Sequence, residues 1–204
     1  MLDHVVANER HIATTYEAYL PSDAAQPEGE QELLALESYV SRSEFERVHM
    51  GAEGVKQFVA EATKKDSGVM ARPPQITCLT RVAGFHSRGE ERGSAVRSGS
   101  GAARPHLLSV CVDLASAQQR EQVLALLAPL CQYVQESEPN TLTYEVCTCS
   151  EAPLRLRILE RYAALADLTQ LHLQSAPFLS FVGKLKQEVG VQLLPSMMRH
   201  YTEQ

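Results

Sequence analysis

The sequence contains no apolar run that approaches the roughly 18 residues needed to cross a lipid bilayer. Its first residues, Met1-Leu2-Asp3-His4, also lack the basic start and the long apolar core of a signal peptide. These two absences argue against a protein that spans or enters a membrane. We therefore expect a cytoplasmic protein.

An excess of basic residues is missing as well. The formal net charge is −6 and the sequence pI is about 5.7, which disfavours general binding of nucleic acid or of an anionic membrane. Hydrophobic residues make up 44% of the chain, enough for a packed core. The 204 residues could form one large domain or two domains of about 100 residues each.

The cysteines lack the spacing patterns of disulfide-bonded or zinc-binding small domains. There are five, an odd number, and no C-x-x-C pair occurs among them, so neither a disulfide framework nor a zinc site is expected. Cys147 and Cys149 fall two apart in an expected strand and so share a face. We interpret them as small apolar residues of a sheet rather than as redox or metal ligands.

What the sequence does contain is an internal repeat. A motif of Leu-Glu-x-Tyr, then His, then Phe-Val occurs twice at an offset of 123 residues, without insertion. The paired positions are Leu36/Leu159, Glu37/Glu160, Tyr39/Tyr162, His49/His172, Phe58/Phe181 and Val59/Val182. Upstream, Tyr16-Glu17 corresponds to Tyr144-Glu145 when one residue is inserted. Such duplication predicts two copies of one structural unit.

The boundary between the copies lies where apolar periodicity disappears. Residues 84–104 are rich in Gly, Ser and Arg, which is typical of a flexible linker. We therefore divide the chain into an N-terminal repeat of residues 1–83, a linker of residues 84–104 and a C-terminal repeat of residues 105–204.

The second copy shows a complete series of elements. The patterns predict strands at 106–113, 141–148, 154–162 and 191–198, a helix at 116–136, a short helix at 165–173 and a last helix that starts after Ser175. The order β-α-β-β-α-β is that of the ferredoxin-like, or split βαβ, unit. Its helices cover one face of the sheet, so the other apolar face needs a cover.

The first copy lacks the residues for its first strand and most of its first helix. Its remaining elements are predicted at 14–20, 32–39, 43–64 and 75–82. Either the front of a complete tandem was lost, or the sequence begins at an internal Met of a longer product.

Several motifs of the second copy resemble the antibiotic biosynthesis monooxygenase family of dimeric α+β barrels. They are E-P-N-T-L-T-Y-E at 138–145, L-E-R-Y at 159–162, His172 and F-L-S-F at 178–181. The resemblance implies an α+β fold in which two ferredoxin-like repeats pack sheet to sheet as a barrel, here as an intramolecular pseudo-dimer. It also implies a cavity for a small aromatic molecule, and in some members oxidation by dioxygen without a cofactor or metal.

For that chemistry we single out His172 as a base and Tyr144 and Tyr162 as hydrogen-bond donors. A weaker second set consists of His49, Tyr16 and Tyr39. Phe178, Phe181 and Glu160 are the candidate substrate-binding residues. The alternative is structural: the histidine would hold a helix break, the tyrosines would plug the barrel end, and Glu160 would face solvent or a helix.

Two departures from the family narrow the function. The chain has no Trp, whereas the haem-degrading and the best-known polyphenol-oxidising relatives carry one in the pocket. The Asn that haem degraders use on their first strand also has no counterpart at 106–111. Haem degradation is therefore disfavoured. Two functions remain: an oxygenase acting on a quinol-type compound, and a non-catalytic binding or assembly module that could pair with another chain through an exposed sheet edge. Other ferredoxin-like dimers are more distant alternatives.

Overall fold

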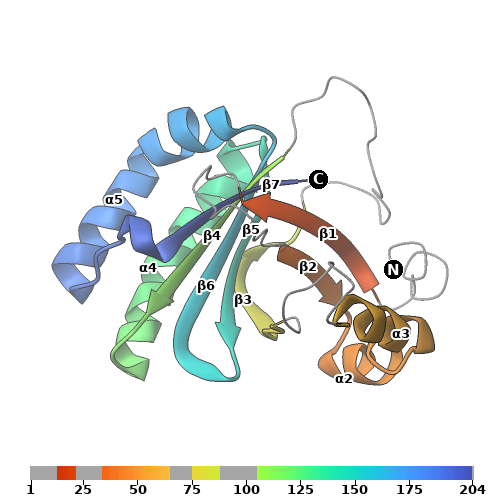
Figure 1. Ribbon diagram of the computed structural model, residues 1–204. Helices are drawn as coiled ribbons and strands as arrows, with labels where there is room; N and C mark the ends of the chain where they lie inside the picture. Colours follow the sequence, from red (N-terminus) through yellow and green to blue (C-terminus); the bar gives the residue numbers. More distant parts are fainter. Residues whose placement is uncertain (1–12, 22–33, 65–74, 88–104, 204) are drawn as a thin grey trace. The chain divides into compact units, whose positions relative to one another are not determined.

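The computed structural model describes residues 13–21, 34–64, 75–87 and 105–203 (Figure 1). Two compact units are present. The first holds most of β2 (Leu34–Tyr39), α2 (Arg42–Glu44), a π-helical turn (Phe45–His49) and α3 (Glu53–Ala62). The second holds the remaining strands from β3 onward together with α4 and α5.

The second unit is built on a five-stranded antiparallel sheet. Its order is β7-β4-β6-β5-β3. The strands are β3 (Leu79–Phe85), β4 (His106–Asp113), β5 (Thr141–Cys149), β6 (Ala152–Tyr162) and β7 (Met198–Glu203). Strands β4 to β7 have the spatial order β7-β4-β6-β5. This is the order expected of a ferredoxin-like unit, in which the first and third strands, here β4 and β6, lie in the centre. The C-terminal part therefore has the predicted α+β fold.

Two strands from the first half of the chain also pair in this unit. β3 runs antiparallel to β5, from Leu79 opposite Cys149 to Phe85 opposite Tyr144. The end of β1 (Ala13–Pro21) pairs with β7, where Tyr19 lies opposite Glu203. β7 thus has β4 on one side and β1 on the other.

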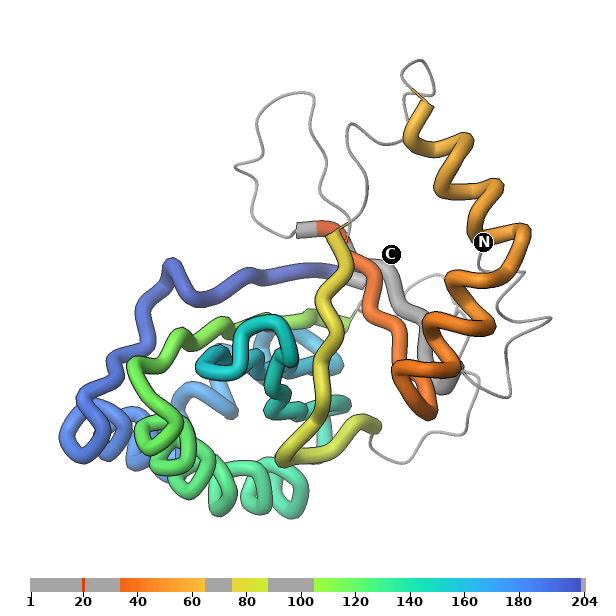
Figure 2. Tube along the Cα trace, turned by 90° about the horizontal axis from the view of Figure 1, so that it is seen from below, coloured from red at the N-terminus to blue at the C-terminus, as the bar shows by residue number. Residues whose placement is uncertain are grey.

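Two helices cover one face of the five-stranded sheet (Figure 2). They are α4 (Ala117–Ser137) and α5 (Ala176–Lys184). The core between them and the sheet includes Val123, Leu127, Leu130 and Val134 of α4, the four residues whose spacing predicts an apolar stripe. α4 begins at Ser116, whose side chain accepts a hydrogen bond from the Gln119 amide.

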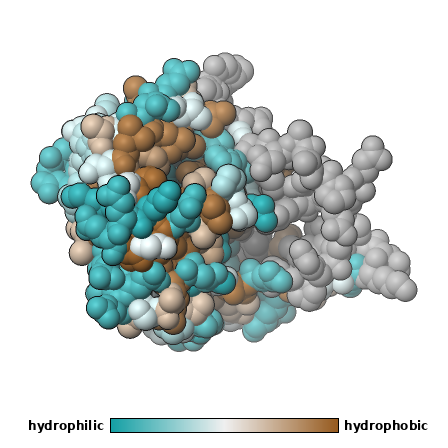
Figure 3. Space-filling model, turned by 90° about the vertical axis from the view of Figure 1, so that its left-hand side faces the viewer, coloured by the Kyte–Doolittle hydropathy of each residue, from teal (hydrophilic) through white to brown (hydrophobic). Residues whose placement is uncertain are grey.

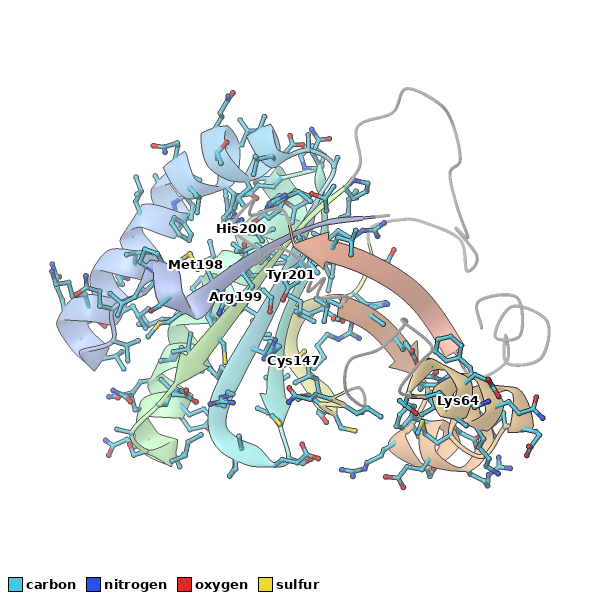
Figure 4. The ribbon with its side chains drawn as sticks, in the orientation of Figure 1. Lys64, Cys147, Met198, Arg199, His200 and Tyr201 are labelled. Atoms are coloured by element: carbon cyan, nitrogen blue, oxygen red, sulfur yellow. The ribbon has the colours of Figure 1, made fainter. Side chains whose placement is uncertain are left out.

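The opposite face of the sheet is buried too. Leu107, Leu159 and Tyr201, which belong to three neighbouring strands, are 1%, 6% and 5% exposed. Cys147 lies on β5 (Figure 4) and is 3% exposed. All five cysteines are free thiols, and burial raises the pKa of Cys147 to about 12. The interpretation of Cys147 and Cys149 as apolar sheet residues is confirmed.

The prediction of a strand at 191–198 is wrong. Gly190 has a left-handed backbone with φ +73, Pro195 begins a short 3₁₀ turn (Pro195–Met197), and the strand follows at 198–203 (Figure 4). Proline lacks the amide needed for a ladder, and the buried Val191 belongs to the helix-covered core instead. The strand predicted at 75–82 is likewise displaced, to 79–85.

Candidate functional site

His172 is placed by a break between two short helical pieces. A π-helical turn (Asp167–Leu171) leads into a 3₁₀ turn (His172–Gln174), and α5 starts after Ser175. The Asp167 carboxylate accepts hydrogen bonds from the Ala164 amide and from the Asn140 side chain. Ser175 caps α5 by accepting a hydrogen bond from the Phe178 amide. These contacts fix the break, and His172 is 0% exposed.

The Nδ1 atom of His172 faces a buried carboxylate. It lies 3.1 Å and 3.0 Å from the two carboxylate oxygens of Glu138, the residue that ends α4. The Thr141 hydroxyl donates a 2.9 Å hydrogen bond to the same carboxylate. Because an ionised carboxylate can only accept, Nδ1 is the donor. Glu138 therefore sets which way the ring points.

The second nitrogen of the ring faces another carboxylate. Nε2 of His172 lies 3.9 Å from Oε2 of Glu160, beyond hydrogen-bond length, and has no hydrogen-bond partner among the described residues. Oε2 of Glu160 accepts a 2.7 Å hydrogen bond from the Tyr162 hydroxyl. This hydroxyl is thus already donated within the protein, which leaves Tyr144 as the candidate donor to a ligand.

Three aromatic rings surround the imidazole. The ring centroids of Tyr144, Tyr162 and Phe178 lie 5.6, 5.7 and 4.9 Å from that of His172. Aromatic faces within about 6 Å stabilise a positive charge. The three rings therefore hold the imidazole within the range in which an aromatic face can attract a positive charge.

The pKa values of the two acid–base groups are shifted in the same direction. Burial lowers the pKa of His172, but the hydrogen bond to Glu138 and the charges of Glu160 and Glu138 outweigh burial, so the pKa is raised. Burial raises the pKa of Glu160, and His172 and the Tyr162 hydrogen bond offset it only in part. A raised pKa disfavours His172 as the proton acceptor, because an imidazolium has no free lone pair.

A small cavity adjoins this network. Its volume is about 20 Å³, enough for about one water molecule. Tyr144, Glu160, Phe178 and Phe181 contribute to its walls, together with Leu108, Val110, Ile158, Leu173, Leu193 and Met198. Four of the residues that the sequence singled out therefore meet at one cavity, whereas His172 and Tyr162 are absent from its lining.

The wall on the α5 side is the less buried one. Leu173, Phe178, Leu193 and Met198 are only half-buried. The exposed Leu179 and Leu194 belong to the same part of the chain, and Figure 3, seen from the α5 side, shows apolar surface bordered by hydrophilic residues. Movement of these half-buried side chains would enlarge the cavity.

The second set of predicted residues lies in the first unit. The Tyr39 hydroxyl donates a 2.6 Å hydrogen bond to Glu37, whose Oε2 lies 3.5 Å from Nε2 of His49. The rings of Tyr39 and Phe45 lie 5.4 Å and 5.7 Å from that of His49. The Tyr16 side chain lies outside the described part of the chain. Two members of this set are therefore brought together around a third carboxylate, Glu37.

Sequence reasoning gave no role to Glu138 or Thr141. Both belong to the E-P-N-T motif that carries the family resemblance. From the sequence, however, Glu138 is interpreted only as part of the segment that ends the preceding helix. The signal that could have identified it is an acid that ends an apolar helix and lies opposite a buried histidine. Only tertiary packing, over a separation of 34 residues, reveals that opposition.

Two absences concern the described residues alone. Within the described ranges, no three His, Cys, Asp or Glu side chains gather as metal ligands would. Among the helices of those ranges, none combines the length and the apolar character needed to cross a membrane.

With the geometry established, comparison with known proteins identifies the fold. Residues 115–184 match the family model of antibiotic biosynthesis monooxygenases. A crystal structure of a "putative monooxygenase" from Lactobacillus acidophilus NCFM is similar at 11% identity and a TM-score of 0.62, over 98% of this chain and 80% of that one. A crystal structure of a "putative monooxygenase" from Fusobacterium nucleatum is similar at 10% identity and a TM-score of 0.62, over 95% of this chain and 75% of that one. No curated protein matches the sequence.

These likenesses support a monooxygenase-like α+β fold. At such identities they concern the fold and not the activity, because one fold supports many functions. The activity has to be argued from the site.

Proposed function

We propose that the chain is a tandem barrel of two related repeats whose C-terminal site oxidises a small quinol-type compound with dioxygen. The recurrence of one arrangement supports the tandem: Tyr162, Glu160 and His172 repeat the contacts of Tyr39, Glu37 and His49. α3 and α5 also begin at equivalent positions, Glu53 and Ala176, each after an extended cap residue.

Sheet-to-sheet packing of the repeats is the second part of the proposal. The face opposite α4 and α5 buries Leu107, Leu159 and Tyr201, so solvent is not its neighbour. Apolar burial is worth roughly 25 cal/mol per Å². Mutual covering by two half-barrels would account for this buried face.

The observation that carries the activity is the buried Glu138–His172–Glu160 network beside an apolar cavity. Burying two carboxylates and an imidazole costs free energy unless they are paired, and clusters of buried ionisable groups of this kind concentrate at functional sites. In our proposal a ligand ring lies against Phe178 and Phe181, the His172 imidazolium stabilises nearby negative charge, and the Tyr144 hydroxyl donates to the developing anion.

The overall reaction balances without an added reductant. A quinol gives up its two hydroxyl hydrogens and one ring hydrogen, and one oxygen atom of O₂ forms a new C–O bond to the ring. The other oxygen atom leaves as water with two of these hydrogens, and the third stays on the new hydroxyl group. The substrate supplies all four electrons, and the product is a hydroxyquinone. This matches the cofactor-free chemistry that the family resemblance implies.

A second function is favoured by the size of the cavity. Ligand pockets usually have volumes of about 300–1,000 Å³, whereas this one has about 20 Å³. In addition, β3 ends the strand order of the sheet and its Val82 is 47% exposed, and such an edge can pair with another chain. The second function is a non-catalytic module that binds a partner, or a second copy, through this edge.

Oxygen uptake with a panel of hydroquinones separates the two functions. For the oxygenase we expect uptake above the rate of autoxidation, reduced by about 100-fold or more in His172→Ala, which removes the buried charge. His172→Gln provides a better-packed variant with the same expected loss. Gln170→Ala, an exposed change two residues earlier, serves as the control with wild-type uptake.

Equal uptake by wild type and both His172 variants would remove His172 from the reaction. No uptake by the wild type with any quinol would reject the oxygenase and favour the binding module. Light scattering on the same sample then tests whether the wild type forms dimers that an edge variant, Val82→Lys, does not.

A further inference from the structure

One oxygen atom of Glu160 is left over. Its Oε2 is engaged by Tyr162 at 2.7 Å, whereas no hydrogen bond from the described residues reaches Oε1. Glu160 is 4% exposed and contributes to the cavity wall. A carboxylate oxygen that receives no donor from the protein is free to accept a hydrogen bond from another molecule. A ligand in the cavity can supply that donor.

Several titratable groups surround Glu160, and one of them, His172, is held in a fixed orientation. The titratable groups near it are Cys131 and Glu138 of α4, Tyr144 of β5, Tyr162 of β6 and His172 beside α5. Of these, His172 is the basic group. Its Nδ1 is hydrogen-bonded to Glu138, so its Nε2 faces Glu160. A carboxylate behind a histidine fixes the tautomer and the direction of the ring.

The charges of this network define what the cavity can hold. Two carboxylates face one imidazolium, which leaves an excess of one negative charge when all three are ionised. Repulsion from Glu160 raises the free energy of an anionic ligand. An uncharged ring that carries a hydroxyl group meets no such repulsion and satisfies Oε1.

We propose that Glu160 recognises the hydroxyl group of an uncharged phenol or quinol through Oε1, and that Glu138 is its positioning residue, acting through His172. This assignment rests on the proposed function, because it presumes that the cavity admits an aromatic ring. It narrows the ligand class: neutral phenols bind, while phenolates and aromatic carboxylates are excluded. Glu160 then stands where it can take the hydroxyl proton before oxidation.

The test uses 4-nitrophenol, whose ionisation is visible as a colour change. With wild-type protein in excess, we expect the ionisation midpoint of the bound probe to rise by about 1–2 pH units, as for any acid beside a like charge. By linkage the neutral form then binds about 10- to 100-fold more tightly than the phenolate. 4-Nitrobenzoate, a carboxylate of similar shape, should bind at least about 10-fold more weakly at the same pH.

The variants divide the roles. In Glu160→Gln the upward shift of the midpoint should disappear, and phenol and phenolate should bind equally. In Glu138→Gln the probe should still bind. Its affinity falls at low pH where Glu160 becomes protonated, and this fall should move to higher pH. The reason is that His172 loses the Glu138 carboxylate that keeps it positively charged. Glu136→Gln, an exposed change on the same helix, should reproduce the wild type in both measurements.

The possible results separate the role of Glu160, the role of Glu138 and the proposed function. Binding with an unshifted or lowered midpoint, or equal affinity for 4-nitrobenzoate, overturns the role of Glu160 and leaves the proposed function intact. An unmoved low-pH limb in Glu138→Gln overturns the role of Glu138 alone. Absence of binding by either probe to the wild type overturns the inference together with the aromatic-ligand function. The wild-type measurements need no variant, so a folding defect cannot obscure them.

Discussion

The Nδ1 atom of His172 lies 3.0 Å from Oε2 of Glu138, and both side chains are almost completely buried, at 0% and 8% side-chain exposure. The pair joins the end of α4 to the break before α5. Since each partner would lose its nearest opposite charge without the other, the contact links the stability of this region to pH.

The first prediction concerns that link. The folded state raises the pKa of His172, so the pair stabilises the protein fully below the unfolded histidine pKa of about 6.5. This stabilisation is lost as the pH rises through the pKa of the folded state. Glu138→Gln should therefore lower the free energy of unfolding by about 1.5–3 kcal/mol at pH 6, the range for hydrogen bonds to charged groups.

Urea unfolding at pH 6 and at pH 9–10 checks this prediction. The difference between wild type and Glu138→Gln should shrink at the higher pH. The exposed Glu136→Gln should show little difference at either pH. A Glu138→Gln effect that stays constant, or grows, as the pH rises would contradict a pair that is charged at pH 6 and loses its charge as folded His172 deprotonates.

The second prediction compares the two copies of one contact. Tyr162 donates to the buried Glu160 at 2.7 Å, and Tyr39 donates to the partly buried Glu37 at 2.6 Å. Tyr162→Phe leaves a buried carboxylate oxygen without its donor, which costs about 1–3 kcal/mol. Tyr39→Phe should cost less, because Glu37 is 18% exposed and water can replace the hydroxyl.

Thermal unfolding of the two variants side by side makes the comparison. The lower midpoint should belong to Tyr162→Phe. Equal losses in both variants would mean that Glu37 is as dry as Glu160 when the protein is in solution, and a larger loss in Tyr39→Phe would refute the ranking.

The third prediction uses two glycines with nearly the same backbone. Gly84 and Gly190 have φ of +80 and +73. A Cβ on Gly190 would meet no atom, whereas one on Gly84 would collide with the backbone carbonyl oxygen of Tyr144 on the paired strand. Gly190→Ala should cost about 1–2 kcal/mol, the penalty for a left-handed Ala. Gly84→Ala should cost clearly more.

Hydrogen exchange locates the damage. In Gly84→Ala the amides of β3 and β5 should lose protection, while Gly190→Ala should leave them as in the wild type. Similar protection of β5 in both variants would show that the β3–β5 pairing tolerates a side chain at position 84.

The sequence predicts much of this second unit because its local signals agree. The 106–113 strand matches as predicted, and the helix predicted at 116–136 is observed at 117–137. Ser116 and Ser175 act as the expected caps. The 198–203 strand was missed because Met-Arg-His-Tyr-Thr-Glu has no apolar run, and its β identity comes from pairing with β4.

The candidate site is predictable only in part. The repeat singles out Glu160, Tyr162 and His172, since both copies keep them. Glu138 could not be assigned, because its role depends on the end of α4 meeting a helix break 34 residues later. The size of the cavity is likewise a result of side-chain packing, which no sequence pattern encodes.

The measurement that tests the central claim most directly is the mass spectrum of the quinone formed under ¹⁸O₂. We predict that the wild-type protein and Gln170→Ala convert a neutral hydroquinone to a hydroxyquinone with one ¹⁸O atom, and that Glu160→Gln and His172→Gln form at least about 100-fold less of it. A product without ¹⁸O, or the same labelled yield from all four proteins, would contradict an oxygenase built on the Glu138–His172–Glu160 network.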